Sequence, residues 1–370
     1  MRKTLFFAFI SFIIIISLLA ECFAGQPEPP KFPLSGPGGA EYKYASFDFE
    51  VFGEGAKKYY IFKPMGKAVE KHPVVVFFHG WGATNPKIYG AWIEHMVRRG
   101  YVVIFPCYQS GLSTPTRDFT SNGIDSVKDA IAGLKEICIV DKIAFVGHSA
   151  GAIIAANVAA SYKFSALPVP AALMCVEPGK TSSRVKRAQM GLGDLSTLPA
   201  EMLLLCVSGE DDRVVQDFDA VKIYDSTRQI AAANKNLIVV RSDRHGLPAL
   251  IADHFAPAAR SCNQIFDSAA GKGGSRTKLT VKIGSAFSNR RASNVKNGME
   301  LDEEYSEKSG ADLGNENALD YYGYWKLFDG LCDAVFYGKN RRFALGNTRE
   351  QRFMGHWSDG TPVNELLIRK

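Results

Sequence analysis

Ser149 is the residue of this 370-residue chain that is best placed to act as a nucleophile. It is the centre of a Gly-x-Ser-x-Gly motif that Gly147 and Gly151 complete, between an apolar strand-like run and an alanine-rich helix-like run. A turn this tight strains the serine backbone and leaves no room for neighbouring side chains, and glycines meet that demand. We predict that Ser149 Oγ projects from a sheet beside a helix N-terminus, which favours a developing negative charge. The alternative is a serine that merely starts a helix.

The motif and its context resemble the nucleophile elbow of the α/β-hydrolase superfamily. The resemblance covers roughly residues 45–260, and it implies a serine hydrolase with an acid and a histidine beside the serine. Cutinase-like, dienelactone-hydrolase-like and chlorophyllase-like secreted esterases are the members that it points to. Two features depart from their pattern. Ala150 stands where cutinases typically carry Met, and residues 268–317 have no counterpart that we can place.

Two backbone amides are candidates for an oxyanion hole, the set of donors that stabilises the negative oxygen formed in acyl transfer. One is the N–H of Ala150, directly after the nucleophile. The other is the N–H of Trp81, because the strand-like run Val74–Phe78 ends in His-Gly-Trp-Gly, which is similar to the superfamily's His-Gly-x element. We interpret His79 as structural. The alternative for the whole segment is a glycine turn that only ends a strand.

The resemblance also implies an acid. In this fold the order along the chain is serine, acid, histidine. Residues 208–215 follow an apolar run and have a Gly-x-x-Asp-x-x-Val spacing similar to the superfamily's acid loop, which places the acid at Asp212. Asp211 is the alternative acid. Glu210 or Asp217 is interpreted as an acid that stabilises the N-terminus of the next helix.

Two histidines follow the next apolar run, Leu237–Arg241, and both are candidates for the general base. His254 lies in Asp-His-Phe-Ala-Pro, which resembles the His-Phe-x-Pro segment of cutinase-like polyester hydrolases, where that histidine is the base. It comes later after the run than it does there, because residues 244–252 intervene. His245 is closer to the end of the run. We favour His254 as the base and keep His245 as the alternative.

The middle of the chain alternates apolar runs with helix-like stretches. Runs that are apolar throughout are typical of strands covered by helices on both faces, so the alternation predicts a doubly wound, mostly parallel α/β sheet. Ligands bind such sheets at the carboxyl ends of the strands, which is where the candidate residues lie. The expected strands are 73–79, 102–106, 143–146, 171–176, 202–207 and 237–240, and the expected helices are about 87–99, 121–136, 151–164 and 217–232.

The remaining segments are arranged around this core. Residues 45–52 and 57–64 alternate apolar and polar around Gly-Glu-Gly, which predicts an antiparallel hairpin at the N-terminal edge of the sheet. The division that we expect is a signal peptide at 1–24, an extended lead-in at 25–44, a hydrolase core at 45–267, a polar insertion or flap at 268–317, and a C-terminal helix and tail at 318–370 that pack on the core.

The N-terminus predicts export. Arg2 and Lys3 precede an uncharged apolar run, Leu5–Ala20, and Ala24 is a suitable last residue before cleavage. A basic start, an apolar middle and a small-residue exit define a secretory signal peptide. The protein is therefore expected to be secreted or periplasmic. The alternative is an uncleaved membrane anchor, since the run is near the short end of a spanning helix.

Composition favours no particular partner. The chain is 46% hydrophobic and 22% charged, and its net charge of +6 attracts anionic surfaces only weakly. We find no zinc-ligand spacing, dinucleotide-binding glycine pattern or phosphate loop, so no metal, cofactor, nucleotide or nucleic acid is expected. Six of the seven cysteines lie beyond the leader, an even number that permits disulfides in an exported chain. Free buried thiols are equally reasonable at Cys175 and Cys206, and the oligomeric state stays open.

A serine, an imidazole and a carboxylate with two amide donors form a site for acyl transfer to water. Hydrolysis of a small or polymeric ester is the expected activity, because ester leaving groups demand less protonation than amines. Only residues 179–198 occupy the interval where many relatives insert a cap domain, so an open cleft is expected. An amidase or peptidase and an acyltransferase would use the same residues. A non-catalytic binding protein on a hydrolase scaffold is the alternative from a different class.

Overall fold

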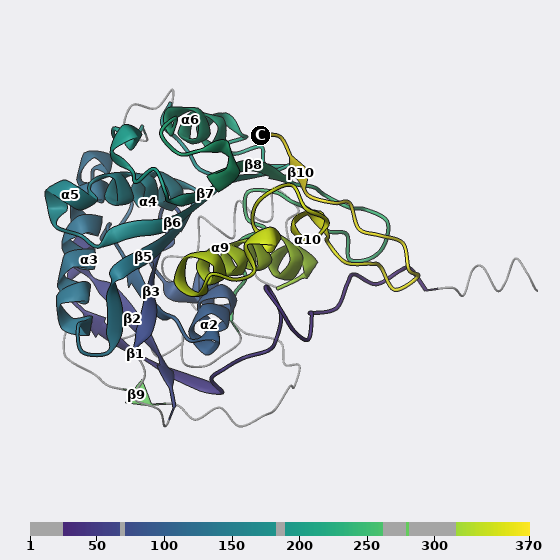
Figure 1. Ribbon diagram of the computed structural model, residues 1–370, viewed down its shortest axis with the longest axis horizontal. Helices are drawn as coiled ribbons and strands as arrows, with labels where there is room; N and C mark the ends of the chain where they lie inside the picture. The colour runs from purple at the N-terminus through teal and green to yellow at the C-terminus, as the bar shows by residue number, and fades with distance from the viewer. Residues whose placement is uncertain (1–24, 67–70, 183–188, 262–278, 281–315) are drawn as a thin grey trace, which may run out of the picture.

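The computed structural model describes residues 25–66, 71–182, 189–261, 279–280 and 316–370. In this described part, ten strands form one sheet in the order β10-β8-β7-β6-β5-β3-β4-β2-β1-β9 (Figure 1). The strands are β1 (Ser46–Phe52), β2 (Tyr59–Met65), β3 (His72–Phe78), β4 (Val102–Pro106), β5 (Cys138–His148), β6 (Val169–Val176), β7 (Leu203–Gly209), β8 (Lys235–Val240), β9 (Leu279–Thr280) and β10 (Leu367–Ile368).

The central strands of the sheet, β3 to β8, run parallel. The antiparallel hairpin of β1 and β2 joins them through β4. The prediction of a mostly parallel α/β sheet with an antiparallel N-terminal hairpin is therefore confirmed. Two short strands extend the ends of the sheet: β9 pairs with β1, and β10 pairs with β8 as the last strand of the chain.

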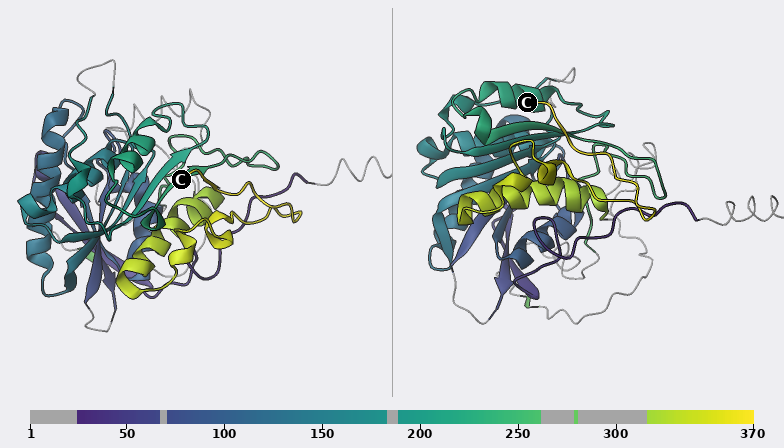
Figure 2. Two further views of the ribbon diagram at one scale, coloured as in Figure 1. Left: turned by 45° about the horizontal axis from the view of Figure 1, so that its top comes forward. Right: turned by 45° about the vertical axis from the view of Figure 1, so that its right-hand side comes forward.

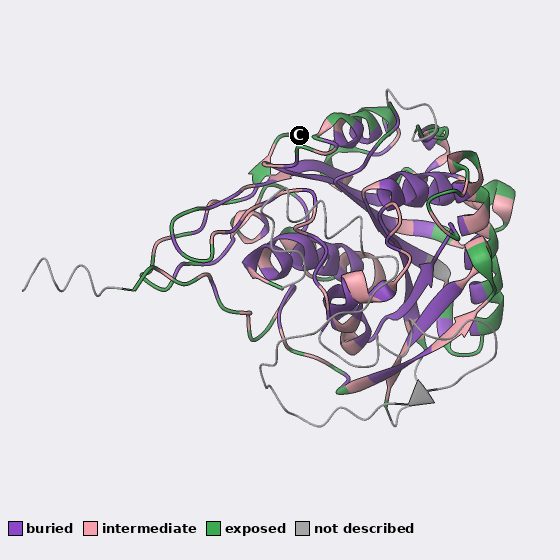
Figure 3. Cartoon of the chain, turned by 180° about the vertical axis from the view of Figure 1, so that it is seen from behind, coloured by how far each residue is buried: buried purple, intermediate pink, exposed green. Residues whose placement is uncertain are grey.

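Alternate residues of the central strands face two hydrophobic layers. In β3, Val75 and Phe77 belong to one layer, whereas Val74, Val76 and Phe78 belong to the other. Helices α2 and α9 cover the first face, and α3, α4 and α6 cover the second (Figures 1 and 2). The strands are thus buried for most of their length, and exposed residues gather on the outer helices (Figure 3). This double coverage explains why the strand signals were continuous apolar runs.

The helices follow the predicted stretches, but the stretch 151–164 is divided into α4 and α5 at Ser161, and two further differences concern α6 and the C-terminal helix. The helices are α2 (Gly90–Arg99), α3 (Phe119–Leu134), α4 (Ala150–Ala160), α5 (Tyr162–Ser165), α6 (Phe218–Ser226), α9 (Lys326–Tyr337), α10 (Arg349–Arg352), the π-helix η7 (Leu319–Trp325), and the short 3₁₀ turns η1 (Gly55–Lys57), η2 (Pro86–Tyr89), η3 (Thr116–Asp118), η5 (Leu195–Thr197), η6 (Ala232–Asn234) and η8 (Arg341–Phe343).

The first difference is that α6 ends at Ser226, whereas the sequence predicted a helix to residue 232. The buried ammonium group of Lys235 donates hydrogen bonds to the carbonyl oxygens of Tyr224 and Thr227, at 2.9 and 2.8 Å. A cation at this place takes the acceptors that a helix leaves open at its C-terminus. The chain can therefore leave the helix early, and it does so at Thr227, which has a ψ of 53°.

The second difference lies in the C-terminal helix, which was expected as one α-helix. Its first seven residues form the π-helix η7, and the chain then continues as α9. The predicted packing face is present, because Leu319, Trp325 and Leu331 are buried, and Tyr322 and Val335 pack against the same core layer.

Asp329 is the polar centre at which the lead-in, α2 and α9 meet. Its carboxylate is fully buried, and Oδ2 accepts hydrogen bonds from the Gly38 amide at 2.7 Å and from His95 Nε2 at 2.8 Å. The same oxygen lies 3.3 Å from Arg99 Nε. Burial alone would raise the pKa of Asp329, but the charges of Arg99 and His95 hold this pKa below its usual value. One carboxylate thus ties three distant segments together.

The cysteines of the described residues are unbridged. Cys107, Cys138, Cys175, Cys206 and Cys332 are free and buried, while Cys262 lies outside the described residues. Among the described residues, none of the helices has the length and apolar character needed to cross a membrane. The predicted leader, residues 1–24, also lies outside them, as does nearly all of the interval 268–317.

We expect Asp329→Asn to lower the free energy of unfolding by about 3–5 kcal/mol, because it removes the main counter-charge of the largely buried Arg99 guanidinium and leaves it, within the described ranges, only the ion pair with Asp333. Urea denaturation of wild type and variant measures the difference. The control is Asp225→Asn, which removes an exposed ion pair with Lys370 and should change stability little. Equal effects of the two substitutions would contradict the role given to Asp329.

Candidate active site

β5 meets α4 in a sharp turn at Ser149, whose φ of 55° and ψ of −124° are unusual for a residue with a side chain. A Cβ on Gly147 would come 2.3 Å from the Gly151 carbonyl oxygen, and one on Gly151 would come 2.2 Å from the Phe78 carbonyl oxygen. Both approaches are too close for any side chain. The glycines therefore allow the turn, and they place Ser149 at the carboxyl end of β5, against the end of β3.

The structure brings Ser149, His254 and Asp212 together at this turn. His254 Nε2 lies 2.9 Å from Ser149 Oγ, and His254 Nδ1 lies 2.9 Å from Asp212 Oδ2. Asp212 and His254 are only 4% and 5% exposed, so little water competes for these bonds. The carboxylate fixes the ring proton on Nδ1, which leaves Nε2 free to accept the proton of the Ser149 hydroxyl.

Asp212 is surrounded by donors. Its Oδ1 accepts hydrogen bonds from the backbone amides of Val214 at 2.8 Å and Val215 at 3.0 Å, and its Oδ2 faces His254. Burial alone would raise the pKa of Asp212. The hydrogen bond and charge of His254, with the two amides, outweigh burial and hold the pKa below its usual value. Asp212 is therefore ionised at neutral pH, as an orienting acid must be.

The two alternative candidates are engaged elsewhere. Asp211 accepts hydrogen bonds from two side chains of residues 242–244, at 2.6 and 2.7 Å. His245 Nε2 lies 2.7 Å from Asp359 Oδ2 in the C-terminal tail, and the His245 side chain is 38% exposed. Of the two late histidines, His254 is thus the one that the fold places against Ser149.

Both predicted oxyanion donors lie in segments that adjoin Ser149. Ala150 is the first residue of α4, so its amide lies at the positive end of the helix. On the other side the loop after β3 approaches closely, because a Cβ on Gly80 would come 3.5 Å from Ser149 Cβ. Trp81 follows Gly80, and its ring packs edge-on against Phe119 with centroids 5.5 Å apart.

A second carboxyl group beside His254 was not foreseen from the sequence. Glu177 follows β6 and is fully buried. Its Oε1 accepts a hydrogen bond from the Tyr324 hydroxyl at 2.9 Å, and its Oε2 lies 3.7 Å from His254 Nδ1 and 3.5 Å from His148 Nε2. Burial, reinforced by the charge of Asp212, raises the pKa of Glu177 well above its usual value. The pKa values of the two neighbouring carboxyl groups are thus shifted in opposite directions.

The sequence did contain a signal for Glu177. This residue directly follows the apolar run 171–176, so it lies at the carboxyl end of a strand, where functional side chains are expected. Tyr324 had no such signal. It is 147 residues further along the chain, and only the packing of η7 against the core brings its hydroxyl to Glu177.

His148, Glu177 and His254 also have the composition of a metal site, with ligand-type atoms within 4.8 Å of one another. However, His148 Nδ1 already meets the Tyr89 hydroxyl at 2.8 Å, and its Nε2 meets the His254 carbonyl oxygen at 2.8 Å. Both ring nitrogens of His254 are engaged as described above. A metal ion would have to break these bonds, so the cluster fits a hydrogen-bond network better than a metal centre.

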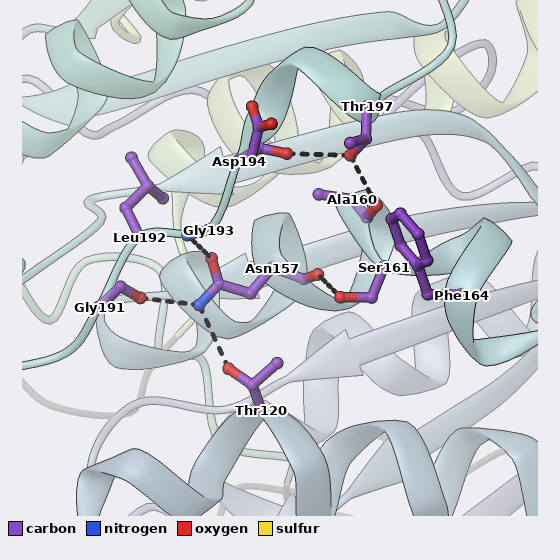
Figure 4. A pocket seen from close by; sticks show the side chains of 10 residues that line it. All are labelled: Thr120, Asn157, Ala160, Ser161, Phe164, Gly191, Leu192, Gly193, Asp194 and Thr197. Atoms are coloured by element: carbon purple, nitrogen blue, oxygen red, sulfur yellow. Dashed lines mark hydrogen bonds between the residues drawn. The ribbon is translucent and has the colours of Figure 1, made fainter.

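A separate open pocket of about 320 Å³ lies where the C-terminal end of α4 meets residues 191–197 (Figure 4). Asn157 crosses it, donating to the Gly191 carbonyl at 2.8 Å and accepting from the Gly193 amide at 2.7 Å. It lies about two helical turns beyond Ser149. Because the nitrogen and the oxygen of the Asn157 amide are both hydrogen-bonded, we infer that this side chain holds the loop against α4.

The sheet and the sharp turn at Ser149 define an α/β-hydrolase fold, as the sequence resemblance implied. Residues 51–192 match the protein-family model described as Chlorophyllase, so this part of the chain is chlorophyllase-like. No curated protein matches the chain. The family match confirms the resemblance and suggests a hydrolase of the esterase type. It includes Ser149 and ends before Asp212 and His254.

We expect Glu177→Gln to change how stability depends on pH. Between pH 4.5, the usual pKa, and the raised pKa of the folded state, the unfolded chain ionises Glu177 while the folded protein keeps it protonated. Wild type must therefore lose stability as the pH rises through this window, and the glutamine variant lacks that loss. Unfolding measured from pH 4.5 to about pH 8 should show a growing advantage of the variant.

The exposed substitution Glu136→Gln is the matched control and should follow wild type across the same range. A variant advantage that stays constant or shrinks with rising pH would mean that Glu177 is not held protonated by its surroundings.

Proposed function

We propose that this protein is an exported serine hydrolase that cleaves carboxylic esters through an acyl-enzyme on Ser149. The observation that carries the proposal is the chain of two 2.9 Å contacts from Ser149 Oγ through His254 to Asp212. The chlorophyllase-like segment supports an ester as the substrate. His254 is the general base and Asp212 the orienting acid.

In the acylation step, Ser149 Oγ attacks the ester carbonyl carbon while His254 Nε2 takes the hydroxyl proton. The resulting imidazolium is stabilised by the Asp212 carboxylate. The carbonyl oxygen becomes an oxyanion, which the amides of Ala150 and Trp81 bind. When this intermediate collapses, the ester C–O bond breaks and His254 returns the proton to the leaving alkoxide, which departs as an alcohol.

Deacylation repeats these steps with water. His254 Nε2 takes a proton from a water molecule as the water oxygen attacks the acyl carbon. The same two amides hold the oxyanion, and the proton passes to Ser149 Oγ as the acid is released. The protein groups return to their starting state, and this scheme uses no cofactor or metal.

An ester, small or polymeric, fits this site better than an amide, because an alkoxide leaves with less protonation than an amine. An acyltransferase would replace water with another acceptor and would reveal itself by ester exchange in the presence of alcohols. A non-catalytic binding protein is the remaining alternative. Binding alone would not explain why Ser149 is held in a backbone conformation that costs about 1–3 kcal/mol.

The test is a panel of p-nitrophenyl esters from short to long acyl chains, with labelling by a fluorophosphonate probe. Ser149→Ala and His254→Ala should each lower turnover by about 10⁴-fold or more, because the two groups act as a unit. Labelling should disappear in Ser149→Ala. His245→Ala is the matched control and should stay within a few-fold of wild type.

Loss of activity in His245→Ala but not in His254→Ala would overturn the assignment of the base. A wild-type protein that neither takes the probe nor turns over any ester would overturn the proposal of a serine hydrolase.

We also propose that the protein is exported to the periplasm or the medium, on the support of the basic start, apolar run and small-residue exit of residues 1–24. N-terminal sequencing of protein recovered outside the cytoplasm should then begin near Gly25. A mature chain that still begins at Met1 would favour the membrane anchor instead.

A further inference from the structure

A line of buried hydrogen bonds runs from the loop after β3 to the backbone of His254. The Gly80 amide donates to the Tyr89 hydroxyl at 2.9 Å, and this hydroxyl lies 2.8 Å from His148 Nδ1. His148 Nε2 in turn lies 2.8 Å from the carbonyl oxygen of His254. Tyr89 and His148 are 1% and 3% exposed, so solvent does not replace these bonds.

The direction of each bond follows from the chemistry of its ends. The carbonyl oxygen of His254 can only accept, so His148 Nε2 carries a proton. Burial lowers the pKa of His148 to about 3, so the ring is neutral and Nδ1 is an acceptor. Tyr89 therefore donates its proton to Nδ1, and its oxygen accepts from the Gly80 amide. Every polar atom along the line is paired in this single arrangement.

The line connects the two groups whose relative position matters most to the reaction proposed above. At one end, Gly80 directly precedes Trp81, the predicted oxyanion donor. The Gly82 amide on the other side of Trp81 donates to Gln109 Oε1 at 3.2 Å, so the peptide carrying this donor is fixed on both sides. At the other end, the His254 backbone determines where the imidazole of that residue can reach.

We propose that Tyr89 and His148 are positioning residues that hold the Trp81 amide and the His254 ring in register around Ser149 Oγ. This inference rests on the proposed function, because it assigns those two groups their catalytic roles. Neither residue needs to touch the substrate. Displacements of about 1 Å in such groups can cost about 100-fold in rate.

The alternative is that Tyr89 matters only for packing. Its ring contacts Phe77, with centroids 4.8 Å apart, and lies in the hydrophobic layer beneath the loop. Tyr89→Phe separates the two possibilities, because it keeps the ring and removes only the hydroxyl that joins Gly80 to His148.

The experiment measures p-nitrophenyl ester kinetics and backbone hydrogen exchange in Tyr89→Phe. We expect kcat to fall about 10–100-fold with KM nearly unchanged, because the lost contacts position the reacting groups rather than bind the substrate. The acid limb of the pH profile should not move, since Tyr89 does not touch the His254 ring. Hydrogen exchange should accelerate in both residues 79–84 and residues 252–256.

Tyr59→Phe is the matched control, because it likewise keeps a buried ring and removes a hydroxyl that is hydrogen-bonded, here to Asp129 at 2.5 Å, outside the site. It should leave kcat and exchange in both loops unchanged. His148→Gln is a second variant, whose amide can still donate to the His254 carbonyl oxygen but cannot pair with Tyr89 in the same geometry. It should repeat the loss of kcat.

Unchanged kcat in Tyr89→Phe, or faster exchange confined to residues 79–84, would overturn the inference. A different observation would contradict the proposed function itself, namely a wild-type protein that shows neither ester turnover nor probe labelling. The exchange measurement then still decides whether the two loops are linked.

Discussion

The turn at Ser149 is the constraint on which the rest of the site depends. To leave β5 and enter α4 within one residue, the chain holds Ser149 at a φ of 55° and brings the backbone of Gly151 against the end of β3. Strain of this kind persists only where the surroundings determine it. Here the surroundings are the buried α4 on one side and the last residues of β3 on the other. The same close approach brings the loops after β3, β6, β7 and β8 within reach of one hydroxyl group.

Burial then dictates how the polar groups around that hydroxyl are arranged. Desolvation penalises unpaired polar atoms and charges, so most polar atoms at the strand ends are paired with one another, and Glu177 Oε2 is an exception. Asp212 keeps its charge because His254 and two amides surround it, whereas burial raises the pKa of Glu177. His148 is held neutral for the same reason. The result is that the pKa of Asp212 is shifted towards its charged form, whereas the pKa values of Glu177 and His148 are shifted towards their neutral forms.

The C-terminal region is part of this arrangement and not an appendage. The family match ends at residue 192, yet η7 supplies the Tyr324 hydroxyl to Glu177, and the tail supplies Asp359 to His245. The second contact has a direct bearing on the proposed chemistry, since it engages the competing histidine at the surface. The region is attached through Asp329, whose burial against α2 joins it to the helix layer behind β3. An esterase-like core has therefore been completed by a segment outside its family pattern.

The sequence by itself determined the parallel sheet, the turn at Ser149 and a short list of candidate acids and histidines, because alternating apolar runs and the glycines on either side of Ser149 are local signals that agree with one another. It predicted Asp212 and His254 in the arrangement that the structure has, although their roles stay proposals. It could not choose between His254 and His245 on geometry, because only loop packing places one ring against Ser149. Nor could it reveal Tyr324, Tyr89 or the proton direction through His148. Those contacts join segments far apart in the chain, and tertiary packing alone decides which buried groups meet.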